Sequence, residues 1–393
     1  MTSKASRRVE TVARIADIPA DAWDACADPD PAVSNPFVRH GFLEALEDAG
    51  TIGGRSGWMP HHLVLKDASG AIAACAPCYL KSHSQGEYVF DHSWADAYAR
   101  AGGRYYPKLQ IAVPFTPVPG RRLLVRPGPD AEANEALLAR AAVEVVERAG
   151  LSGVHITFAS EGEWNRLAAQ GFLQRTDQQF HWTNAGYTSF EDFLASLASR
   201  KRKAVRKERA EAVASGLTIE WVRGRDIKEA HWDAFFSFYM DTGSRKWGRP
   251  YLNRKAFSLI GAAMGESCLL MLAKRGDRAV AGSFHMIGGE CLYGRYWGAI
   301  EHHPCLHFEL CYYQAIEFAI AHRIARVEAG AQGEHKLARG YLPTRTYSLH
   351  YIADPALRRA VADYLVRERA YVEAASEELA EYAPFRKVAP DQM

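Results

Sequence analysis

Hydrophobic residues recur along the chain with two periods, one near 3.6 residues and one of two residues. The first period predicts amphipathic helices and the second predicts half-buried strands. In the first half, these patterns predict helices at 36–49, 91–101, 134–149 and 163–169, and strands at 9–15, 62–66, 72–81, 109–113, 154–159 and 179–183. The strands at 62–66 and 72–81 flank the turn DASG and form a predicted hairpin.

The second half repeats this order of elements. Its pattern predicts helices at 190–215, 229–241, 254–261, 308–321 and 355–378, and strands at 218–222, 268–274, 279–287, 290–299 and 326–328. Each half places a meander of antiparallel strands before a helix and a further strand, although no residue-level repeat is evident. We therefore expect an α/β protein of the α+β type with mixed, largely antiparallel sheets, divided into domains at 1–183 and 184–393.

The composition is that of a globular protein, with 393 residues of which 48% are hydrophobic, enough for two domains. The net charge of +2 excludes a globally basic nucleic-acid binder, so anion binding must come from local patches. The N-terminal sequence lacks the apolar core of a secretory signal, and no window approaches 18 uncharged apolar residues. We expect no membrane span and a cytoplasmic location, where the seven scattered cysteines remain free thiols.

Motifs for metal sites and for nucleophilic hydrolysis are missing from the sequence. Cys75 and Cys78 form a C-x-x-C motif, but they lie in an apolar strand and have no second pair of ligands at zinc spacing. Neither H-E-x-x-H nor G-x-S-x-G occurs. The sequence therefore predicts neither a bound metal nor a serine nucleophile.

Residues 328–343, EAGAQGEHKLARGYLP, form a polar segment between two apolar runs. Its glycines interrupt any regular period, and its chemistry-bearing residues are Glu328, Gln332, Glu334, His335, Lys336, Arg339 and Tyr341. The simpler interpretation is a solvated loop with its own salt bridges. Because the segment lies between the apolar run at 320–327 and a predicted strand at 347–352, we favour a loop that lines a cleft.

A second candidate site is the basic helix at 199–210, SRKRKAVRKERA. Helical geometry places Arg202, Arg206 and Arg209 on one face, which predicts a phosphate-binding patch. The alternative is an ordinary solvated face. If the patch binds phosphate, replacing all three arginines with Gln should weaken substrate binding and leave folding nearly intact.

In the first half of the chain, polar groups cluster at His83, Glu87, Tyr88 and Asp91, with aromatic residues nearby. An extended strand would place His83, Gln85 and Glu87 on one face. His83, Glu87, Tyr88 and Asp91 are therefore candidates for substrate binding. The alternative is hydrogen bonding to a surface between the two domains.

Long strings of the sequence carry a resemblance to a known family. They include NPFVRHGFLEAL at 35–46, YYPKLQIAVPFTPVPGRRLL at 105–124, the basic helix, and YGRYWGAIEHHPCLHFELCYYQAIEFAI at 293–320. Over nearly its whole length the chain resembles the predicted N-acyltransferases of the GNAT superfamily with a Fem-like tandem arrangement, described as peptidoglycan biosynthesis or recognition proteins. The resemblance implies two tandem GNAT-like domains, a bacterial cytoplasmic protein, and transfer of an acyl or aminoacyl group to an amine.

One departure from the acetyltransferase pattern concerns the donor. That pattern holds a pyrophosphate with a glycine-rich loop between a strand and the next helix, and Arg295 and Gly298 match it. Ile300 replaces its last small residue, so we expect weak or absent acetyl-CoA binding. No tightly bound cofactor is expected, and the donor is open among acyl-CoA, acyl carrier protein and aminoacyl-tRNA. An acidic carrier protein or a tRNA suits the basic helix.

The resemblance implies direct attack of an amine, from a small molecule or a peptide, on the activated donor. Glu309, Glu328 and His335 are the candidate bases, and Lys336, Arg339 and Tyr341 are candidates for orientation or oxyanion support. His307 is a further substrate-binding candidate, and it faces Glu309 only if the helix is irregular there. The alternatives are a non-catalytic binding protein for a cell-wall precursor or peptide, and an N-acyltransferase that depends on acyl carrier protein.

Overall fold

The computed structural model describes residues 7–246, 250–330 and 333–386. The chain divides into two compact units. Unit 1 comprises the described residues up to Asp177 together with Arg345–Glu373, and unit 2 comprises Gln178–Thr344 with the described residues from Ala374 onward. The expected division at 183/184 therefore differs in two respects. The first boundary lies at 177/178, and residues 345–373 return to the first unit, because their strand pairs with β8 (Gly153–Ala159) there.

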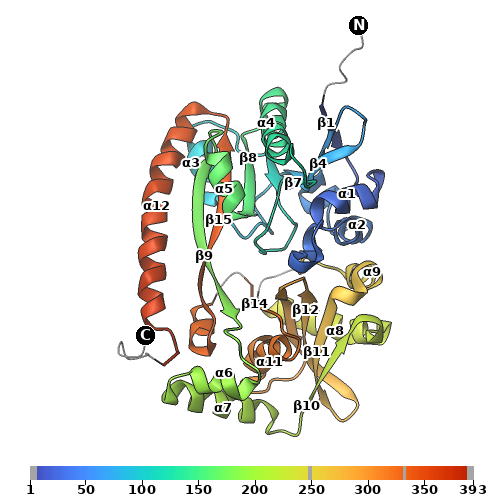
Figure 1. Cartoon of the computed structure of the whole chain (residues 1–393), viewed down its shortest axis with the longest axis vertical. Helices are drawn as coiled ribbons and strands as arrows, with labels where there is room; N and C mark the ends of the chain where they lie inside the picture. The colour runs from blue at the N-terminus through green and yellow to red at the C-terminus, as the bar shows by residue number, and fades with distance from the viewer. Residues whose placement is uncertain (1–6, 247–249, 331–332, 387–393) are drawn as a thin grey trace. The chain divides into compact units, whose positions relative to one another are not determined.

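Unit 1 contains two sheets. One is antiparallel with the order β1-β3-β4-β7, and the other has the order β15-β8-β6-β5-β2 within this unit. The strands are β1 (Arg8–Val12), β2 (Trp58–Pro60), β3 (His62–Lys66), β4 (Ile72–Ala76), β5 (Cys78–Lys81), β6 (Lys108–Ile111), β7 (Leu124–Val125), β8, and the last part of β15 (Leu342–Ile352). Strands β6 and β8 are parallel, and the chain passes through β7 and the long helix α4 between them (Figure 1).

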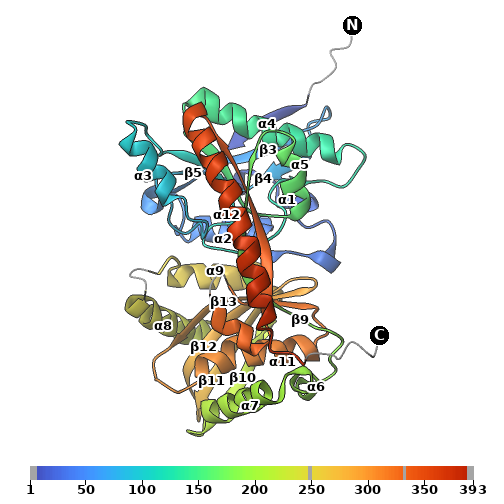
Figure 2. The same cartoon turned by 90° about the vertical axis from the view of Figure 1, so that its left-hand side faces the viewer.

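The helices of unit 1 pack on the first sheet and on both faces of the second. They are α1 (Ala20–Ala27), α2 (His40–Asp48), α3 (His92–Arg100), α4 (Ala131–Ala149), α5 (Glu161–Ala168) and the first part of α12 (Pro355–Glu381). One sheet face is apolar, and its Leu109 and Ile156 belong to one core with Leu138 of α4. The other side is covered by α3 and by α12, which is the helix in front in Figure 2. Leu365 of α12 belongs to one core with Trp94 of α3.

Unit 2 has one sheet of the order β10-β11-β12-β13-β14-β9. Its strands are the end of β9 (Leu173–Thr183), β10 (Thr218–Arg223), β11 (Cys268–Arg275), β12 (Arg278–Ile287), β13 (Cys291–Ala299) and β14 (Arg326–Glu328). Neighbouring strands are antiparallel except for β13 and β14, which are parallel. The helix between those two strands comprises α10 (Leu306–Phe308), the π-helical turn η7 (Glu309–Tyr313) and α11 (Gln314–Ala321).

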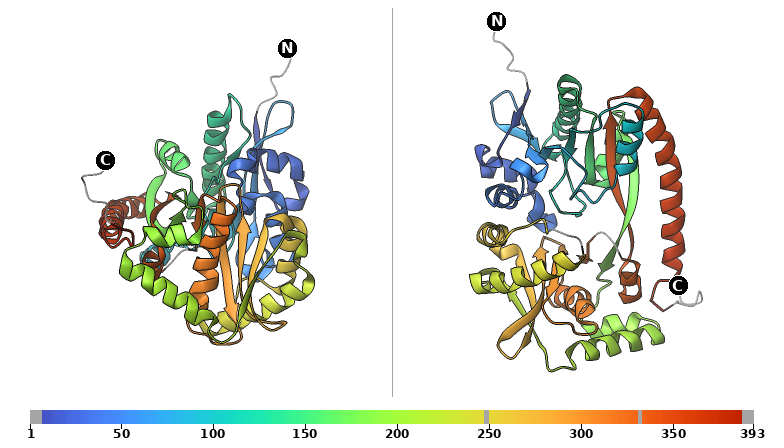
Figure 3. Two further views of the ribbon diagram at one scale, coloured as in Figure 1. Left: turned by 60° about the horizontal axis from the view of Figure 1, so that its bottom comes forward. Right: turned by 180° about the vertical axis from the view of Figure 1, so that it is seen from behind.

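Helices also cover both faces of the unit 2 sheet (Figure 3). Those of one face are α6 (Phe190–Ser196), α7 (Ser199–Val213) and α11, which share a core with Leu269, Leu292 and Val327. Those of the other face are α8 (Glu229–Lys246) and α9 (Arg254–Met264), whose aromatic side chains pack on Phe284 of β12. Burial on both faces explains why the inner strand β11 is apolar from Cys268 to Ala273.

Both units place antiparallel strands before a helix that leads to a strand parallel to the preceding one. In unit 1 these elements are β6, α4 and β8, and in unit 2 they are β13, α10 to α11 and β14. The expected fold class, α/β with mixed sheets, is confirmed. Among the described residues, no helix combines the length and the apolar composition that crossing a membrane requires.

Three predicted elements are divided in the structure. The predicted helix at 190–215 is two helices, α6 and α7, because the buried Leu197 between them is extended, with φ −77° and ψ 149°. The predicted strand at 72–81 breaks at Pro77, which has no N–H to donate, and β4 and β5 join different sheets. The predicted helix at 36–49 starts as a 3-10 turn, Pro36–Val38, before α2 begins.

Candidate functional site

In unit 2, strands β13 and β14 separate after three residue pairs. Their parallel pairing ends at Tyr293 and Glu328, although β13 continues. Next to this point, the register between β12 and β13 shifts between Phe284 and His285. Such a β-bulge bends a strand and redirects its side chains. The two strands therefore leave an opening beside Gly294.

A cavity of about 110 Å³ lies in this opening. Its lining residues come from β12, from β13, from the helix and from the position just after β14. They are Ser283, Phe284, His285, Gly294, Arg295, Tyr296, Trp297, His307, Cys311, Tyr312 and Ala329. One water molecule occupies about 30 Å³ in the liquid. The cavity therefore has room for a group of only a few heavy atoms, such as the reactive end of a larger molecule.

The helical wall of this cavity contains the π-helical turn η7. Hydrogen bonds in a π-helix span five residues, and such turns are frequent at functional sites. The turn follows His307 and contains Cys311 and Tyr312, and all three side chains line the cavity. Residues two apart, such as His307 and Glu309, can face each other only where a helix is irregular. The helix is irregular here, but the carboxylate of Glu309 points to Arg209 of α7 and not to His307.

Tyr312 connects the cavity to an exposed side chain. Its hydroxyl lies 2.9 Å from Nε2 of His335, and the tautomer of the imidazole decides which of the two atoms donates. Tyr312 is buried, which raises the pKa of its hydroxyl, whereas His335 is exposed. A buried hydroxyl hydrogen-bonded to an exposed imidazole offers a proton path between the cavity and solvent.

Glu309, one of the candidate bases, forms an ion pair with α7. Its carboxylate accepts hydrogen bonds of 2.8 to 3.1 Å from Arg209 and one of 2.8 Å from Gln314. The Glu309 side chain is only 3% exposed and does not line the cavity. Charge-assisted hydrogen bonds between a guanidinium and a carboxylate are strong and geometrically specific. This geometry suits a fixed ion pair between helices better than a group that must accept a proton.

Glu328, a second candidate base, is the last residue of β14 and is buried. Burial raises the pKa of its carboxyl to about 7, although Arg326, with Nε 3.2 Å from Oε1, acts in the opposite direction. Oε2 of Glu328 has no hydrogen-bond partner within the described part of the chain. Glu328 does not line the cavity, but the next residue, Ala329, does.

We expect Glu328→Gln to be more stable than the wild type at pH 8, where the buried carboxylate is charged. This gain in the free energy of unfolding should be about 3 kcal/mol larger at pH 8 than at pH 5. A carboxyl whose pKa is raised on folding binds a proton more tightly in the folded state, so its favourable contribution is lost as the pH rises toward about 7. Urea unfolding at the two pH values measures the difference. Glu290→Gln is the control, because Glu290 lies 3.2 Å from the same arginine but its side chain is 48% exposed. Equal pH responses of the two variants would contradict the expectation.

The predicted site segment packs on the π-helical turn. Glu334 and His335 are exposed, Lys336, Arg339 and Tyr341 are buried, and Gln332 lies outside the described residues. Arg339 donates to both carboxylate oxygens of Glu208 in α7, and Lys336 donates to the backbone carbonyl of Gly330 at 2.9 Å. Burial lowers the pKa of Lys336 to about 8. Of the described residues of this segment, only Ala329 lines the cavity.

The three arginines of the predicted phosphate patch have different environments on α7. Arg209 is held by two acids of the helix that contains η7 and α11, at 2.8 and 2.6 Å. Arg206 is exposed and pairs with an exposed acid of α6, and Arg202 is half-buried. The face of α7 that is most exposed to solvent carries other cations, Arg200, Lys203 and Lys207.

Residues 295–300, which match the pyrophosphate pattern in part, do not form a loop. Arg295 and Gly298 lie within β13, and Gly298 faces α8. A Cβ on Gly298 would lie 2.1 Å from the backbone oxygen of Phe238, so glycine is required there by the close approach of helix and strand. The partial match to the pyrophosphate pattern therefore lies in a strand, and the role of Arg295 in phosphate binding stays a prediction. Arg295 instead lines the cavity, with its guanidinium 5.3 Å from the ring centroid of Tyr296.

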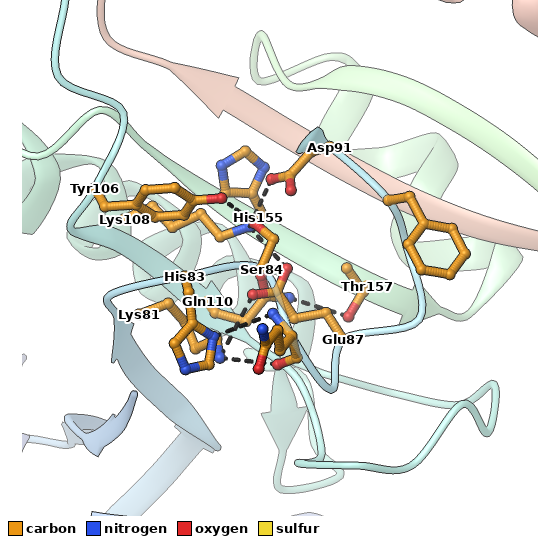
Figure 4. A network of polar contacts seen from close by, with 12 residues as sticks. Lys81, His83, Ser84, Glu87, Asp91, Tyr106, Lys108, Gln110, His155 and Thr157 are labelled. Carbon is orange, nitrogen blue, oxygen red and sulfur yellow. Dashed lines mark hydrogen bonds and ion pairs between the residues drawn. The ribbon is translucent and has the colours of Figure 1, made fainter. Parts of the chain in front are cut away.

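In unit 1, two of the predicted substrate-binding residues surround a buried lysine that the sequence analysis missed. Nζ of Lys108 donates to Ser84 at 2.8 Å, to Glu87 at 2.7 Å and to Asp91 at 2.5 Å (Figure 4). Lys81 lies directly opposite Lys108 in the β5–β6 ladder. Both lysines are fully buried, so their charges are balanced by the two carboxylates rather than by water.

The expected alternation of side chains along a strand at 83–87 is wrong, because β5 ends at Lys81 and the chain to α3 is irregular. Glu87 and Asp91 are buried on the lysines, whereas His83 and Tyr88 are half-buried. Nε2 of His83 lies 3.1 Å from the backbone carbonyl of Ser56. Burial lowers the pKa of His83. The four candidates therefore divide into an inner pair and an outer pair.

Other sites in the described ranges are less suited to chemistry. No group of three or more His, Cys, Asp or Glu side chains within them is arranged to hold a metal ion. A larger cavity of about 790 Å³ lies beside β1 and α4 in unit 1, and Arg7, Arg8, Arg140 and Arg148 contribute to its wall. None of the predicted site residues lines it. The small cavity of unit 2 and the lysine cluster of unit 1 remain the two places where predicted site residues converge.

Comparison with known proteins gives both family and fold. The family model for FemAB-like proteins, described as peptidoglycan biosynthesis/recognition, matches residues 14–387. A search of curated proteins gives no match. Among solved structures, FemX is 12% identical with a TM-score of 0.53, over 90% of this chain and 100% of its own. L-PGS from Bacillus licheniformis is 9% identical with a TM-score of 0.50, over 85% of this chain and 98% of its own.

These two likenesses show a shared fold over most of the chain, and they carry no activity with them at such low identity. A tandem GNAT protein from the clavulanic acid biosynthesis pathway is also similar, at 12% identity and a TM-score of 0.45, over 89% of this chain and 99% of its own. The family match spans almost the whole sequence. The expected family is therefore confirmed: the chain belongs to the FemAB-like family.

Proposed function

We propose that unit 2 transfers an activated acyl or aminoacyl group to an amine, and that the reacting atoms meet in the cavity beside Gly294. The observation that carries this proposal is the convergence in one small cavity of a strand released from its parallel neighbour, an imidazole and a tyrosine linked to an exposed histidine. Membership of the FemAB-like family supports the same class of reaction.

The proposed reaction is direct attack of the amine nitrogen on the acyl carbon. The new C–N bond forms, the bond to the leaving group breaks, and the proton lost by the amine passes to His307 in the cavity wall. Tyr312 gives its proton to the leaving group and regains one from His335. Backbone N–H groups of β13 beside Gly294 stabilise the developing oxyanion, because fixed dipoles in a cavity shielded from water are effective there.

The size of the cavity bears on the donor. A volume of about 110 Å³ admits the acyl end and leaves the body of the donor outside. The donor classes therefore remain acyl-CoA, acyl carrier protein and aminoacyl-tRNA, and we expect acetyl-CoA to be a poor donor. The acceptor is the amine of a small molecule or a peptide, and the family description makes a cell-wall precursor peptide a natural candidate.

Incubation with each donor class and a panel of amines, analysed by mass spectrometry, tests the proposal. We expect acylated product with at least one donor, and about hundredfold less product from Gly294→Val, because a misplacement of about 1 Å has such effects on rate. A Cβ on Gly294 already lies 3.3 Å from the backbone oxygen of Glu328, so the valine methyl groups extend into the cavity.

Gly265→Val is the matched control, since a Cβ there meets no atom within 4 Å. If no donor gives product while a cell-wall peptide binds, the chain is a binding protein and the proposed transfer is overturned. Product formation that Gly294→Val leaves unchanged would move the reaction to another site.

A further inference from the structure

One face of the second sheet of unit 1 is polar and yet buried. Its residues alternate with the apolar core positions of the same strands and include Tyr79, Lys81, Lys108, Gln110, His155 and Thr157, all at most 1% exposed. A protein normally buries polar groups only where they find hydrogen-bond partners, because each unpaired group costs free energy. Each polar group on this face is therefore expected to have a hydrogen-bond partner.

Several atoms on this face have no hydrogen-bond partner among the described residues. They are Oη of Tyr79, Oε1 of Glu87, Oδ1 of Asp91, Oε1 of Gln110, Nε1 of Trp94 and Nε2 of His350. The carboxylate and amide oxygens can only accept hydrogen bonds. Acceptors therefore predominate, and the group that would complete this face is a hydrogen-bond donor rather than an anion.

The charges of the cluster point to a donor that is also a cation. Two lysines, Lys81 and Lys108, face two carboxylates, Glu87 and Asp91, so the cluster is balanced only while both lysines are protonated. Burial lowers the pKa of Lys81 to about 7, with the charge of Lys108 acting in the same direction and Glu87 against it. When Lys81 is neutral, the ammonium of Lys108 faces the two carboxyl groups without the second charge.

Aromatic rings extend this preference for a cation. Nζ of Lys81 lies 3.8 Å from the centroid of the Trp58 ring, and Nζ of Lys108 lies 5.7 and 6.0 Å from the centroids of Tyr105 and Tyr106. The faces of aromatic rings attract ammonium groups. Lys81 thus holds its own ammonium in a position that suits the ammonium of a ligand.

The segment 82–91 covers this face and supplies Ser84, Glu87 and Asp91 (Figure 4). It contains no helix or strand. Backbone hydrogen bonds join Ser82 to Gly57 and Gly86 to Phe115, and two of its backbone carbonyls accept from side chains, Gln85 from Trp58 and Lys81, and Phe90 from Arg175. Moving the segment breaks these bonds, exposes the lysines and carries the carboxylates with it, while the strands of the sheet stay paired. Access to the polar face therefore does not require unfolding of the sheet.

We propose that this face of unit 1, under the segment 82–91, binds the ammonium group of an amine ligand between Glu87, Asp91 and the Trp58 ring. The ligand ammonium donates to Oε1 of Glu87 and Oδ1 of Asp91. It replaces the charge of Lys81, whose Nζ lies 3.7 Å from the same Glu87 oxygen, and Lys81 stays in the site as a neutral amine. This site is separate from the proposed transfer cavity of unit 2, and its occupancy does not depend on acyl transfer.

Calorimetry with pentylamine, which is a cation at both pH 6 and pH 8, tests the site without any donor. The wild type should bind it about tenfold more tightly at pH 8, because at pH 6 binding must displace a proton from Lys81. Lys81→Met should bind equally well at both pH values, and Lys66→Met, which removes a 39% exposed lysine of unit 1, should behave as wild type. Glu87→Gln should weaken binding at least tenfold at both.

Several outcomes would overturn the proposal. They are absence of pentylamine binding, tighter binding of pentanoate than of pentylamine, and a pH dependence that persists in Lys81→Met. The last outcome would assign the titration to another group facing Lys81, namely Glu87, whose pKa burial raises, or His83, Asp91 or Lys108. If Glu87→Gln does not fold, the comparison of wild type with Lys81→Met still decides, because it needs no change at either carboxylate.

Discussion

Replacing Tyr312 with Phe should lower kcat for the proposed transfer by about a hundredfold or more and change KM little, because proton transfer by a positioned side chain contributes about 10² to 10⁴ to a rate. The substitution removes the phenolic oxygen, which lies 2.9 Å from Nε2 of His335. It leaves the ring that lines the cavity in place. Steady-state kinetics with the donor identified by mass spectrometry gives the two parameters.

Tyr313→Phe is the matched control for this experiment. Tyr313 is the next residue of the same π-helical turn and is equally buried, but its hydroxyl donates to Glu208 and its side chain does not line the cavity. We expect its loss to lower stability modestly and to leave kcat unchanged. Equal losses of kcat in the two variants would mean that both substitutions act by disturbing the π-helical turn, and that Tyr312 has no role in proton transfer.

Arg209→Met should lower the free energy of unfolding by about 3 to 5 kcal/mol, because it leaves the buried carboxylate of Glu309 without its cation. The Arg209 side chain is 24% exposed and Glu309 is 3% exposed, so solvent replaces little of the lost interaction. The guanidinium also lies 4.3 Å from the ring centroid of Phe190, which adds packing to the charge pair. Urea unfolding followed by circular dichroism measures the change.

Arg206→Met on the same helix is the control. Its ion pair with Glu191 is 55% and 68% exposed, and pairs of this kind contribute about 0 to 1 kcal/mol. Similar stabilities of the two variants would show that the Arg209 pair is no stronger than a surface pair. The structure therefore revises the expectation that all three arginines can be replaced without cost to folding, since one of them joins two helices.

The charge pattern on α7 illustrates how far local sequence information extends. Helical periodicity correctly places Arg202, Arg206 and Arg209 near one another, because that depends on 3.6 residues per turn. It cannot show that Glu309, 100 residues later, neutralises one of them. Such pairing depends on how helices pack, and that is a property of contacts remote in sequence.

The lysine cluster of unit 1 also depends on contacts between residues that are remote in sequence. Lys81 and Lys108 stand at the ends of apolar runs, YLK and KLQI, where a lysine ordinarily extends into solvent. Only the cross-strand pairing of β5 with β6 brings the two together, and only the covering segment buries them. Glu87 and Asp91 are predicted as site residues from the sequence, but Glu87 is predicted in a strand and Asp91 at the start of a helix, because an irregular segment has no period to reveal it.

By itself, the sequence determined the fold class, the family and most helices and strands, because these follow from hydrophobic period, capping residues and long characteristic strings. It also directed attention to His307, Glu328 and His335. The tertiary structure decided which of these meet: the separation of β13 from β14 and the π-helical turn bring His307 and Tyr312 to one cavity and turn Glu309 toward α7. Side chains from distant segments converge through strand pairing and helix packing, which no local pattern encodes.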